Sequence, residues 1–307
     1  MVKVVAVNIS KEKGVIKKPV NEIILSGTGI ENDAHAGSWH RQVSLLAKES
    51  IQKYAEKLGR DIQPGEFAEN ITTEGMEIYK ATPLSCFENV NIVLQVTQIG
   101  KKCHGSNCAI FKESGDCVMP KEGVFARVIK GGRLKAGDIL NYIPKVVKAL
   151  IITLSDRASK GEYNDISGPK LENNLKDHIK KLGWEFGSEL KIIPDEVDQL
   201  REVIEASYAD YDVIFTTGST GIGPRDIAPE ALKPLLDKEI PGIMELIRVK
   251  YGMDKPNAIL SRSVAGVKGD TLIYSIPGSP KAIDEYCIEI FKTLKHSMLM
   301  IRSIDSH

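Results

Sequence analysis

The second half of the chain alternates between strand-like and helix-like segments, and this pattern constrains the fold most strongly. Three apolar runs rich in β-branched residues predict strands at residues 149–154, 212–217 and 271–276. Helical segments are expected at about 169–182, 229–236 and 241–251, and from residue 280 onward. Such alternation is typical of a parallel sheet with helices on its faces. We therefore expect a three-layer α/β domain with a mostly parallel sheet over residues 146–307.

The last of these helices carries the clearest local signals. Ser279 precedes it as an N-cap candidate and Pro280 occupies its first position, and both residue types are favoured at those places. An apolar stripe then recurs at helical spacing on Ile283, Cys287, Ile290, Phe291 and Leu294. Such a stripe is suited to a core or to a subunit interface.

Before residue 146 the chain consists mainly of short strands and turns. Strands are expected at residues 4–9, 91–96 and 124–129, and glycine-rich turns lead into the boundary at residues 130–144. Helical periodicity is clear only over residues 44–58, with Ser44 near the start of that helix. We expect a β-barrel-like domain with one main helix over residues 1–145. The 307 residues also exceed the usual size of a single core, which favours two domains.

Composition excludes several classes of protein. Lys plus Arg and Asp plus Glu are both 41, so the net charge is zero, whereas a dedicated nucleic-acid binder is normally basic. The apolar runs are too short to cross a bilayer, and the N-terminus lacks the pattern of a signal peptide. We expect a soluble cytoplasmic protein that binds neither membranes nor nucleic acid.

A loop rich in glycine and hydroxyl side chains follows the strand predicted at 212–217. Gly218, Gly221 and Gly223 fall within six residues, which lets main-chain N–H groups approach an anion closely. The loop is not a Walker A motif, because no Lys-Ser/Thr pair follows. An ordinary turn is the alternative interpretation. Residues that we expect to contact phosphate are Thr217, Gly218, Ser219, Thr220 and Gly221.

Polar residues also follow the other predicted strands of this half. Parallel strands bring their carboxyl ends to one edge of the sheet, so these residues are expected to form one pocket. Asp195 and Asp226 supply the hard oxygen ligands that Mg²⁺ prefers, although a turn residue and a helix N-terminal residue are the alternative interpretations. Further candidate ligand-binding residues are Ser155, Asp156, Arg157, Pro277 and Gly278. Arg225 adds a cation beside the loop.

Six segments occur in an order that resembles one family. They read SDRASKGEYNDISG, IPDEVDQL, TTGSTGIGPRDIAPEA, PGIMELIR, LSRSVAG and IPGSPKAIDE. Together they resemble the molybdopterin adenylyltransferases of the MogA/MoaB type over residues 146–304. The resemblance implies that Mg-ATP adenylylates the terminal phosphate of molybdopterin and that pyrophosphate is released. It also implies a homo-oligomer, since members commonly form trimers.

Carried onto matching positions, the resemblance makes Asp195 and Asp226 the essential carboxylates. The pterin-binding loop falls on residues 217–221, and Ser263 is expected to contact pterin or phosphate. Ser219 departs from the family, which usually has glycine there. A negative φ at Ser219 would leave its hydroxyl available to phosphate, whereas a positive φ would strain the loop.

Cysteines cluster in the first half, at Cys103, Cys108 and Cys117, with His104 beside the first of them. Lysines and His104 should favour the thiolate of Cys103, which could carry a persulfide or ligate a soft metal. A structural zinc site is one alternative, although the spacing is not a familiar one. The other alternative is that the three cysteines are buried and serve as small hydrophobic residues.

The first half resembles a MOSC domain. The segments that carry the resemblance read NDAHAG, HRQVSLL, GEFAENITTEG, QVTQIGKKCH and EGVFARVIKGG. It implies binding of molybdenum cofactor or sulfur handling, with the family cysteine on Cys103. Upstream, His35, His40 and Arg41 lie within seven positions and form a candidate anion site.

These observations favour a bifunctional protein of molybdenum cofactor biosynthesis. Its expected partners are ATP and molybdopterin, and downstream a molybdenum insertase or apo-molybdoenzymes. A non-catalytic cofactor carrier is a competing hypothesis, although a carrier needs no pair of metal-binding aspartates. Action on another phosphate compound is a third.

Overall fold

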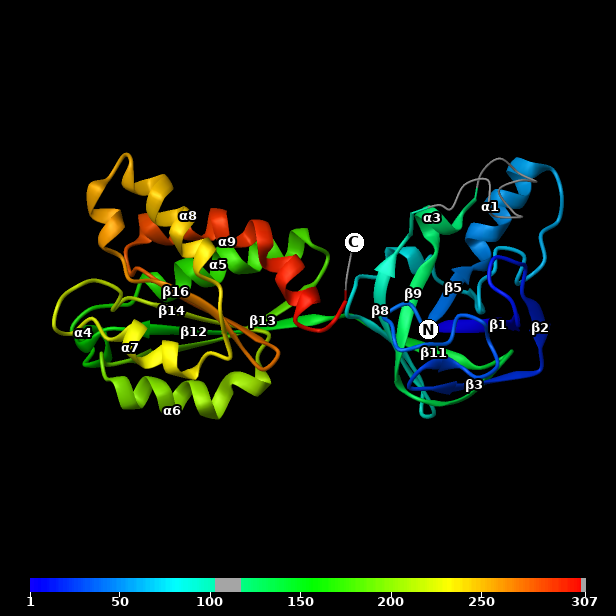
Figure 1. The fold of residues 1–307 in the computed structure, drawn as a ribbon, viewed down its shortest axis with the longest axis horizontal. Helices are drawn as coiled ribbons and strands as arrows, with labels where there is room; N and C mark the ends of the chain where they lie inside the picture. The colour runs from blue at the N-terminus through cyan, green and yellow to red at the C-terminus, as the bar shows by residue number, and fades with distance from the viewer. Residues whose placement is uncertain (103–116, 305–307) are drawn as a thin grey trace. The chain divides into compact units, whose positions relative to one another are not determined.

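The computed structural model describes residues 1–102 and 117–304. The chain divides into two compact units, Met1–Lys145 and Val146–His307, which we describe separately (Figure 1). Each unit encloses its own hydrophobic core.

The N-terminal unit is a closed barrel of seven strands. In order around the barrel these are β1 (Val2–Ile9), β11 (Ile139–Ile143), β7 (Cys86–Glu88), β8 (Val93–Ile99), β9 (Val124–Lys130), β5 (Val43–Ala47) and β6 (Ile71–Glu74). Pairing of Val2 with Leu140 closes the ring. β2 (Lys18–Val20) extends the sheet beside β1, and a small second sheet contains β10 (Gly132–Lys135), β3 (Glu22–Ser26) and β4 (Gly29–Ile30). The barrel confirms the predicted fold class of this half.

One element of the barrel differs from its prediction. The periodicity over residues 44–58 predicts a single helix, but the structure has strand β5 followed by helix α1 (Lys48–Leu58). All five residues of β5 are buried, because the strand lies between β6 and β9 within the barrel. Ser44 is therefore a strand residue, not a helix start. Two short helical turns, η1 (Ile78–Lys80) and α3 (Met119–Glu122), complete the described part of this unit.

The C-terminal unit is built on a six-stranded sheet. Its order is β13 (Glu185–Ile193), β12 (Val146–Leu154), β14 (Val213–Thr217), β17 (Thr271–Ile276), β16 (Val264–Lys268) and β15 (Lys238–Glu239). The first four strands are mutually parallel, and β16 and β15 complete the sheet with antiparallel pairing. The predicted mostly parallel sheet is confirmed.

Helices cover both faces of this sheet (Figure 1). On one face, α6 (Val197–Ser207) and α7 (Ala228–Leu232) pack against Leu150, Ile152 and Ile214. The other face carries α5 (Ser167–Lys181), α8 (Pro241–Gly252) and α9 (Pro280–Met300). Shorter helical segments are α4 (Asp156–Ser159), η3 (Tyr208–Asp210), η4 (Lys233–Leu235) and η5 (Pro256–Leu260). The helix expected at 229–236 is thus divided between α7 and η4.

The start of α9 agrees with its sequence signals. Ser279 caps the helix, because its hydroxyl accepts a hydrogen bond from the N–H of Ala282 at 3.3 Å. Ile283, Cys287, Ile290 and Leu294 are buried, so most of the apolar stripe belongs to the core of this unit. Phe291 stacks on His178 of α5 with ring centroids 4.5 Å apart.

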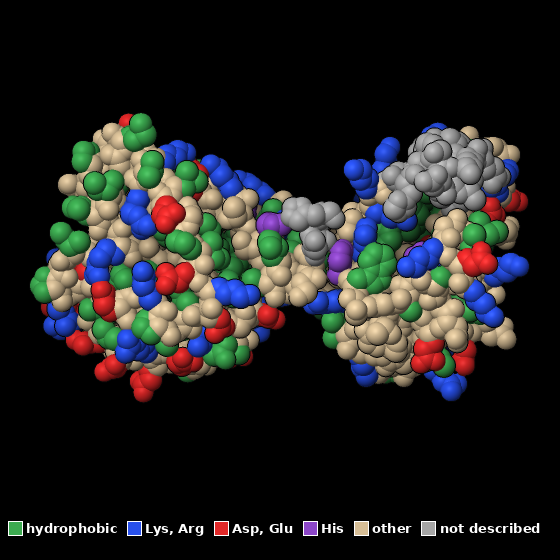
Figure 2. All heavy atoms as spheres, in the orientation of Figure 1, with side chains coloured by type: hydrophobic (Ala, Val, Ile, Leu, Met, Phe, Trp, Pro, Cys, Tyr) green, Lys and Arg blue, Asp and Glu red, His purple; other side chains and the backbone are tan. Residues whose placement is uncertain are grey.

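The surface agrees with the neutral composition. On the face of the C-terminal unit seen in Figure 2, basic and acidic side chains are interspersed. Within residues 1–102 and 117–304, no helix is both long and apolar enough to cross a membrane.

Candidate functional site

The glycine loop begins where β14 ends, and Gly218 makes its first turn possible. Gly218 has φ of +100°, and a Cβ there would lie 2.5 Å from the carbonyl oxygen of Leu154 on the neighbouring strand. Any larger residue would therefore clash as well as being strained. The loop is joined to the turn after β17, since Thr217 Oγ1 donates to the carbonyl oxygen of Pro277 at 3.1 Å. A Cβ on Gly278 would lie 3.3 Å from the Cα of Gly218, so the predicted residues of these two loops come together.

Ser219 has a positive φ, the case in which the loop is expected to be strained. Its φ is +57°, in the left-handed region that costs a non-glycine residue roughly 1–2 kcal/mol. Its hydroxyl donates to the carbonyl oxygen of Arg225 at 3.0 Å and accepts from the N–H of Ile227 at 2.8 Å. These bonds join the two ends of the loop. The hydroxyl therefore has internal partners, which argues against the expected phosphate contact.

Asp226 lies against the glycine loop. Its Oδ2 accepts a hydrogen bond from the N–H of Gly223 at 2.8 Å. A Cβ on Gly221 would come within 2.7 Å of the same oxygen, so the absence of a side chain at Gly221 allows the carboxylate its place. The loop and the carboxylate thus form one compact group.

Asp195 lies at the end of β13 and is paired with Asp156. The N–H of Asp156 donates to Asp195 Oδ2 at 2.9 Å, and the N–H of Asp195 donates to Asp156 Oδ1 at 3.2 Å. Arg225 binds Asp156 with two nitrogens, at 2.9 and 2.8 Å, and binds Glu196 at 2.8 Å. A chain of contacts therefore runs from Asp195 through Asp156 to Arg225, the residue next to Asp226.

The contacts between Arg225, Asp156 and Asp195 give Arg225 and Asp156 a structural role. The hydrogen bonds from Arg225 lower the pKa of the Asp156 carboxyl, which stays ionised near neutral pH. The guanidinium of Arg225, which the sequence predicts as a cation beside the loop, is bound by the carboxylates of Asp156 and Glu196. Both residues hold the site together.

The two aspartates have the chemistry that Mg²⁺ requires. Among the residues that the structure describes, no group of three or more His, Cys, Asp or Glu side chains is placed to hold a metal. Mg²⁺ needs only one or two carboxylates when phosphates and water complete its octahedron. Asp195 and Asp226 each accept one main-chain N–H at Oδ2, and an ionised carboxylate has capacity for further partners.

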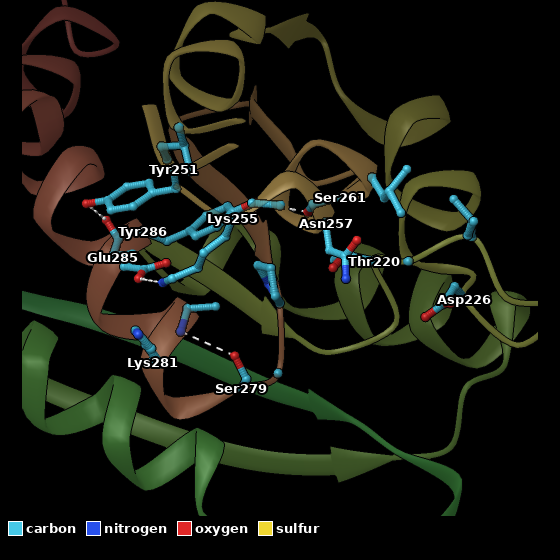
Figure 3. A pocket seen from close by; sticks show the side chains of 18 of the residues that line it. Thr220, Asp226, Tyr251, Lys255, Asn257, Ser261, Ser279, Lys281, Glu285 and Tyr286 are labelled. Carbon is cyan, nitrogen blue, oxygen red and sulfur yellow. Dashed lines mark hydrogen bonds and ion pairs between the residues drawn. The ribbon is translucent and has the colours of Figure 1, made fainter. Parts of the chain in front are cut away.

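A pocket of about 560 Å³ opens beside the loop. Thr220 and Asp226 lie toward one end, and Tyr251, Lys281 and Glu285 lie toward the other (Figure 3). The pocket is lined by the glycine loop, the turn after β17, and residues of α8, η5 and α9. Ser155, Asp156, Arg157, Asp195 and Ser263 lie outside this lining.

The far end of the pocket was not foreseen from the sequence. Lys255 pairs with Glu285, and this contact raises the pKa of Lys255. Tyr251 donates from its hydroxyl to the main-chain oxygen of Glu285 at 3.2 Å. Tyr251 and Glu285 lie on α8 and α9, and Lys255 lies between α8 and η5, so reasoning from strand ends could not identify them. Aromatic and charged residues at helical spacing are also ordinary on solvated helix faces.

Three predicted residues have structural partners near the site. Ser155 caps α4 by accepting from the N–H of Ala158 at 3.2 Å. Arg157 lies over the ring of Tyr163, with 5.3 Å between its guanidinium carbon and the ring centroid. Ser263 is buried, and its hydroxyl lies 2.8 Å from that of Ser261, which does line the pocket. Ser263 therefore contacts a residue that lines the pocket without lining it itself.

In the N-terminal unit the candidate histidines and arginine have different partners. His35 Nδ1 lies 3.3 Å from Nζ of Lys17, which forms a buried ion pair with Asp33. Burial lowers the pKa of Lys17, and its hydrogen bond to Asp33 opposes that shift. The carbonyl oxygen of His40 accepts from Thr97 at 2.6 Å. Arg41 lies over the ring of Trp39, 4.9 Å from its centroid. The anion site stays a prediction.

The cysteine cluster is only partly described. Cys103, His104 and Cys108 lie outside the described residues, so the thiolate and zinc interpretations stay predictions. Cys117 is buried in an apolar cluster that also contains Tyr54, Phe67 and Met119. Burial raises the pKa of Cys86 and raises that of Cys287 to about 12, so these two thiols stay protonated near neutral pH.

Comparisons with known proteins assign a family to each unit. Residues 150–296 match the model of the probable molybdopterin binding domain, and residues 32–141 match the MOSC domain. A molybdopterin adenylyltransferase of Helicobacter pylori is 37% identical over 153 residues, which are 49% of this chain and 85% of that protein. One from Pyrococcus furiosus is 38% identical over 164 residues, covering 50% of this chain and 93% of the relative.

A longer relative matches the same half. Gephyrin of Dictyostelium discoideum is 38% identical over 160 residues, which are 50% of this chain but 22% of that protein. These relatives therefore match the C-terminal unit, and the model of the MOSC domain matches the N-terminal unit. The chain belongs, through its C-terminal half, to the MogA/MoaB family of the molybdopterin adenylyltransferases, and its N-terminal half carries a MOSC domain.

Proposed function

We propose that this protein acts in molybdenum cofactor biosynthesis and that its C-terminal unit adenylylates molybdopterin with Mg-ATP. The observation that carries the proposal is the position of Asp226. Its carboxylate lies against the glycine loop and lines a pocket large enough for a nucleotide or a pterin. Asp195 is linked to the same region through Asp156 and Arg225.

In the proposed reaction, an oxygen of the molybdopterin terminal phosphate attacks the α-phosphorus of ATP. A new P–O–P bond forms, the bond to the β-phosphate breaks, and pyrophosphate leaves. This chemistry needs positioning and charge neutralisation more than a strong nucleophile on the protein. Bound Mg²⁺ would supply the neutralising charge. Asp195 and Asp226 would hold it, and the main-chain N–H groups of the glycine loop would orient the phosphates.

We infer a related role for the MOSC domain. It would bind the molybdenum cofactor or handle sulfur, with Cys103 as sulfur carrier or metal-facing thiolate. A molybdenum insertase or apo-molybdoenzymes would receive the product. The family relationship favours a homo-oligomer, with a trimer as the proposed state, and we propose a cytoplasmic location for the chain.

A non-catalytic carrier is the alternative function. A carrier would need the pocket but not two aspartates connected through Asp156 and Arg225, so the connection of Asp195 to Asp226 favours the enzyme. A carrier should also be purified with bound pterin. The absorbance spectrum of the freshly purified protein distinguishes these two cases.

The proposal is tested by pyrophosphate release from Mg-ATP with and without molybdopterin. Release should depend on the pterin and should fall by at least about 100-fold in Asp226→Asn, which keeps the shape but removes the charge. Asp237→Asn is a matched control, because the Asp237 carboxylate accepts from the N–H of Gly269 in the turn before β17 and does not line the pocket. Pterin binding without any release by the wild type would contradict the proposal and favour the carrier.

A further inference from the structure

Arg262 lies two residues before β16, and its guanidinium is bound on three sides. Its Nε donates to the carbonyl oxygen of Gly221 at 2.6 Å, and its Nη2 donates to the carbonyl oxygen of Asp226 at 2.7 Å. Its Nη1 pairs with the carboxylate of Glu230 on α7. All three nitrogens are therefore engaged by oxygens of the protein.

The main chain of Arg262 binds the same loop. Its N–H donates to the carbonyl oxygen of Thr220 at 2.8 Å. The glycine loop leaves β14, whereas Arg262 approaches from β16, on the far side of β17 in the sheet. A residue distant in sequence thus contacts the loop at Thr220 and Gly221 and also contacts the main chain of Asp226.

We propose that Arg262 is a positioning residue for adenylyl transfer, which holds the glycine loop and Asp226 at one fixed separation. This inference rests on the proposed function. Arg262 does not line the pocket beside Asp226, although it borders a second cavity with Glu230. Its donors face protein oxygens, so it acts through the loop and not on a substrate bound beside Asp226. Phosphate held by the loop and Mg²⁺ held by Asp226 must be placed together, and their separation depends on this contact.

Lysine cannot replace Arg262 in this role. The guanidinium presents donors in different directions from one rigid plane, whereas an ammonium donates from a single nitrogen. Arg262→Lys keeps the positive charge but cannot reach Gly221, Asp226 and Glu230 together. The substitution therefore separates the bridging role from the charge.

Arg201 on α6 provides a matched control. Its Nη2 donates to the carbonyl oxygen of Glu230 at 2.9 Å and its Nε donates to that of Ala231 at 3.4 Å. Arg201→Lys thus removes the same type of contact to α7 while leaving the contacts of the glycine loop intact. Glu230→Gln is a second variant, which removes the ion pair of Arg262 but leaves its contacts to Gly221 and Asp226.

The test measures pyrophosphate release as a function of Mg²⁺ and ATP concentration in the wild type and these variants. Because a displacement of about 1 Å costs a positioned group about 100-fold, we expect Arg262→Lys to lower kcat by about 10- to 100-fold. The Mg²⁺ concentration for half-maximal rate should rise by about 10-fold. Arg201→Lys should stay within about 3-fold of the wild type, and the melting temperatures of both lysine variants should agree within about 3 °C.

Amide hydrogen exchange over residues 218–228 provides a readout that does not depend on turnover. Exchange there should quicken by about 10-fold in Arg262→Lys and stay unchanged in Arg201→Lys. Wild-type kcat and Mg²⁺ dependence in Arg262→Lys would overturn the inference, and so would losses matched by Arg201→Lys. If the wild type releases no pyrophosphate, the proposed function fails. Unchanged exchange in Arg262→Lys would then separately show that Arg262 does not hold the loop.

Discussion

Ser219 offers a prediction whose magnitude can be worked from the geometry. Its hydroxyl makes two hydrogen bonds, to Arg225 and from Ile227, and each is worth about 1 kcal/mol net. Ser219→Ala removes both bonds and keeps the strain of the positive φ, so it should lower the free energy of unfolding by about 2 kcal/mol. Ser219→Gly loses the same bonds but relieves the strain.

The backbone strain that Ser219→Gly relieves is partly offset by the greater entropy of glycine in the unfolded chain. A left-handed residue other than glycine costs roughly 1–2 kcal/mol, and glycine loses about 0.4–1 kcal/mol through the greater entropy of its unfolded chain. The glycine variant should therefore be about 1 kcal/mol more stable than the alanine variant, while remaining less stable than the wild type. The ordering wild type, glycine, alanine is the distinctive expectation.

The two tryptophans allow this measurement on one unit. Trp184 is buried in the C-terminal unit and Trp39 lies in the N-terminal unit. In a Trp39→Phe background, urea unfolding followed by tryptophan fluorescence reports the C-terminal unit alone. An alanine variant as stable as its parent, or one more stable than the glycine variant, would refute the reasoning about this loop.

Three further predictions address other contacts. Gly218→Ala should abolish nucleotide binding by titration calorimetry, because the new Cβ would meet the Leu154 carbonyl oxygen at 2.5 Å. Asp156→Asn should lower the melting temperature at neutral pH, and this difference from the wild type should shrink as pH falls from 3.8 towards the lower pKa that Asp156 has in the folded protein. Arg225 lowers the pKa of Asp156 in the folded protein. The stabilisation that this ion pair provides is therefore complete above the pKa of Asp156 in the unfolded chain, and it is lost as pH falls through the lower pKa of the folded protein. Lys17→Met should cost the N-terminal unit about 3 kcal/mol, followed through Trp39 fluorescence in a Trp184→Phe background, because it leaves a buried carboxylate without its ammonium.

The elements with strong local signals could be predicted from the sequence. The strand at 271–276 and the cap of α9 at Ser279 agree with the structure, because hydrophobic pattern and capping chemistry are local properties. Strand β5 could not be predicted in this way. Its residues fit a helical stripe, and only pairing with β6 and β9, which are distant in sequence, makes the segment a strand.

The site residues also divide into those that local sequence signals identify and those that depend on contacts distant in sequence. The glycine loop and Asp226 were identifiable, because residue types following a strand carry a direct chemical meaning. The engagement of Arg225 by Asp156 and the role of Arg262 depend on contacts between residues 69 and 41 positions apart, which one sequence does not reveal. Lys281 and Glu285 lie within a segment that carries the family resemblance, but their part in the pocket depends on how α8 and α9 pack, which the segment alone does not show.

The central claim is the transfer of an adenylyl group to molybdopterin. Its most direct test is to incubate the protein with molybdopterin and ATP labelled at the α-phosphate, and to identify the labelled product by mass spectrometry. We predict a pterin product that carries the label and the mass of an added AMP group, formed by the wild type and not by Asp226→Asn. Label found only in free AMP or unreacted ATP, with the pterin unmodified, would contradict the account.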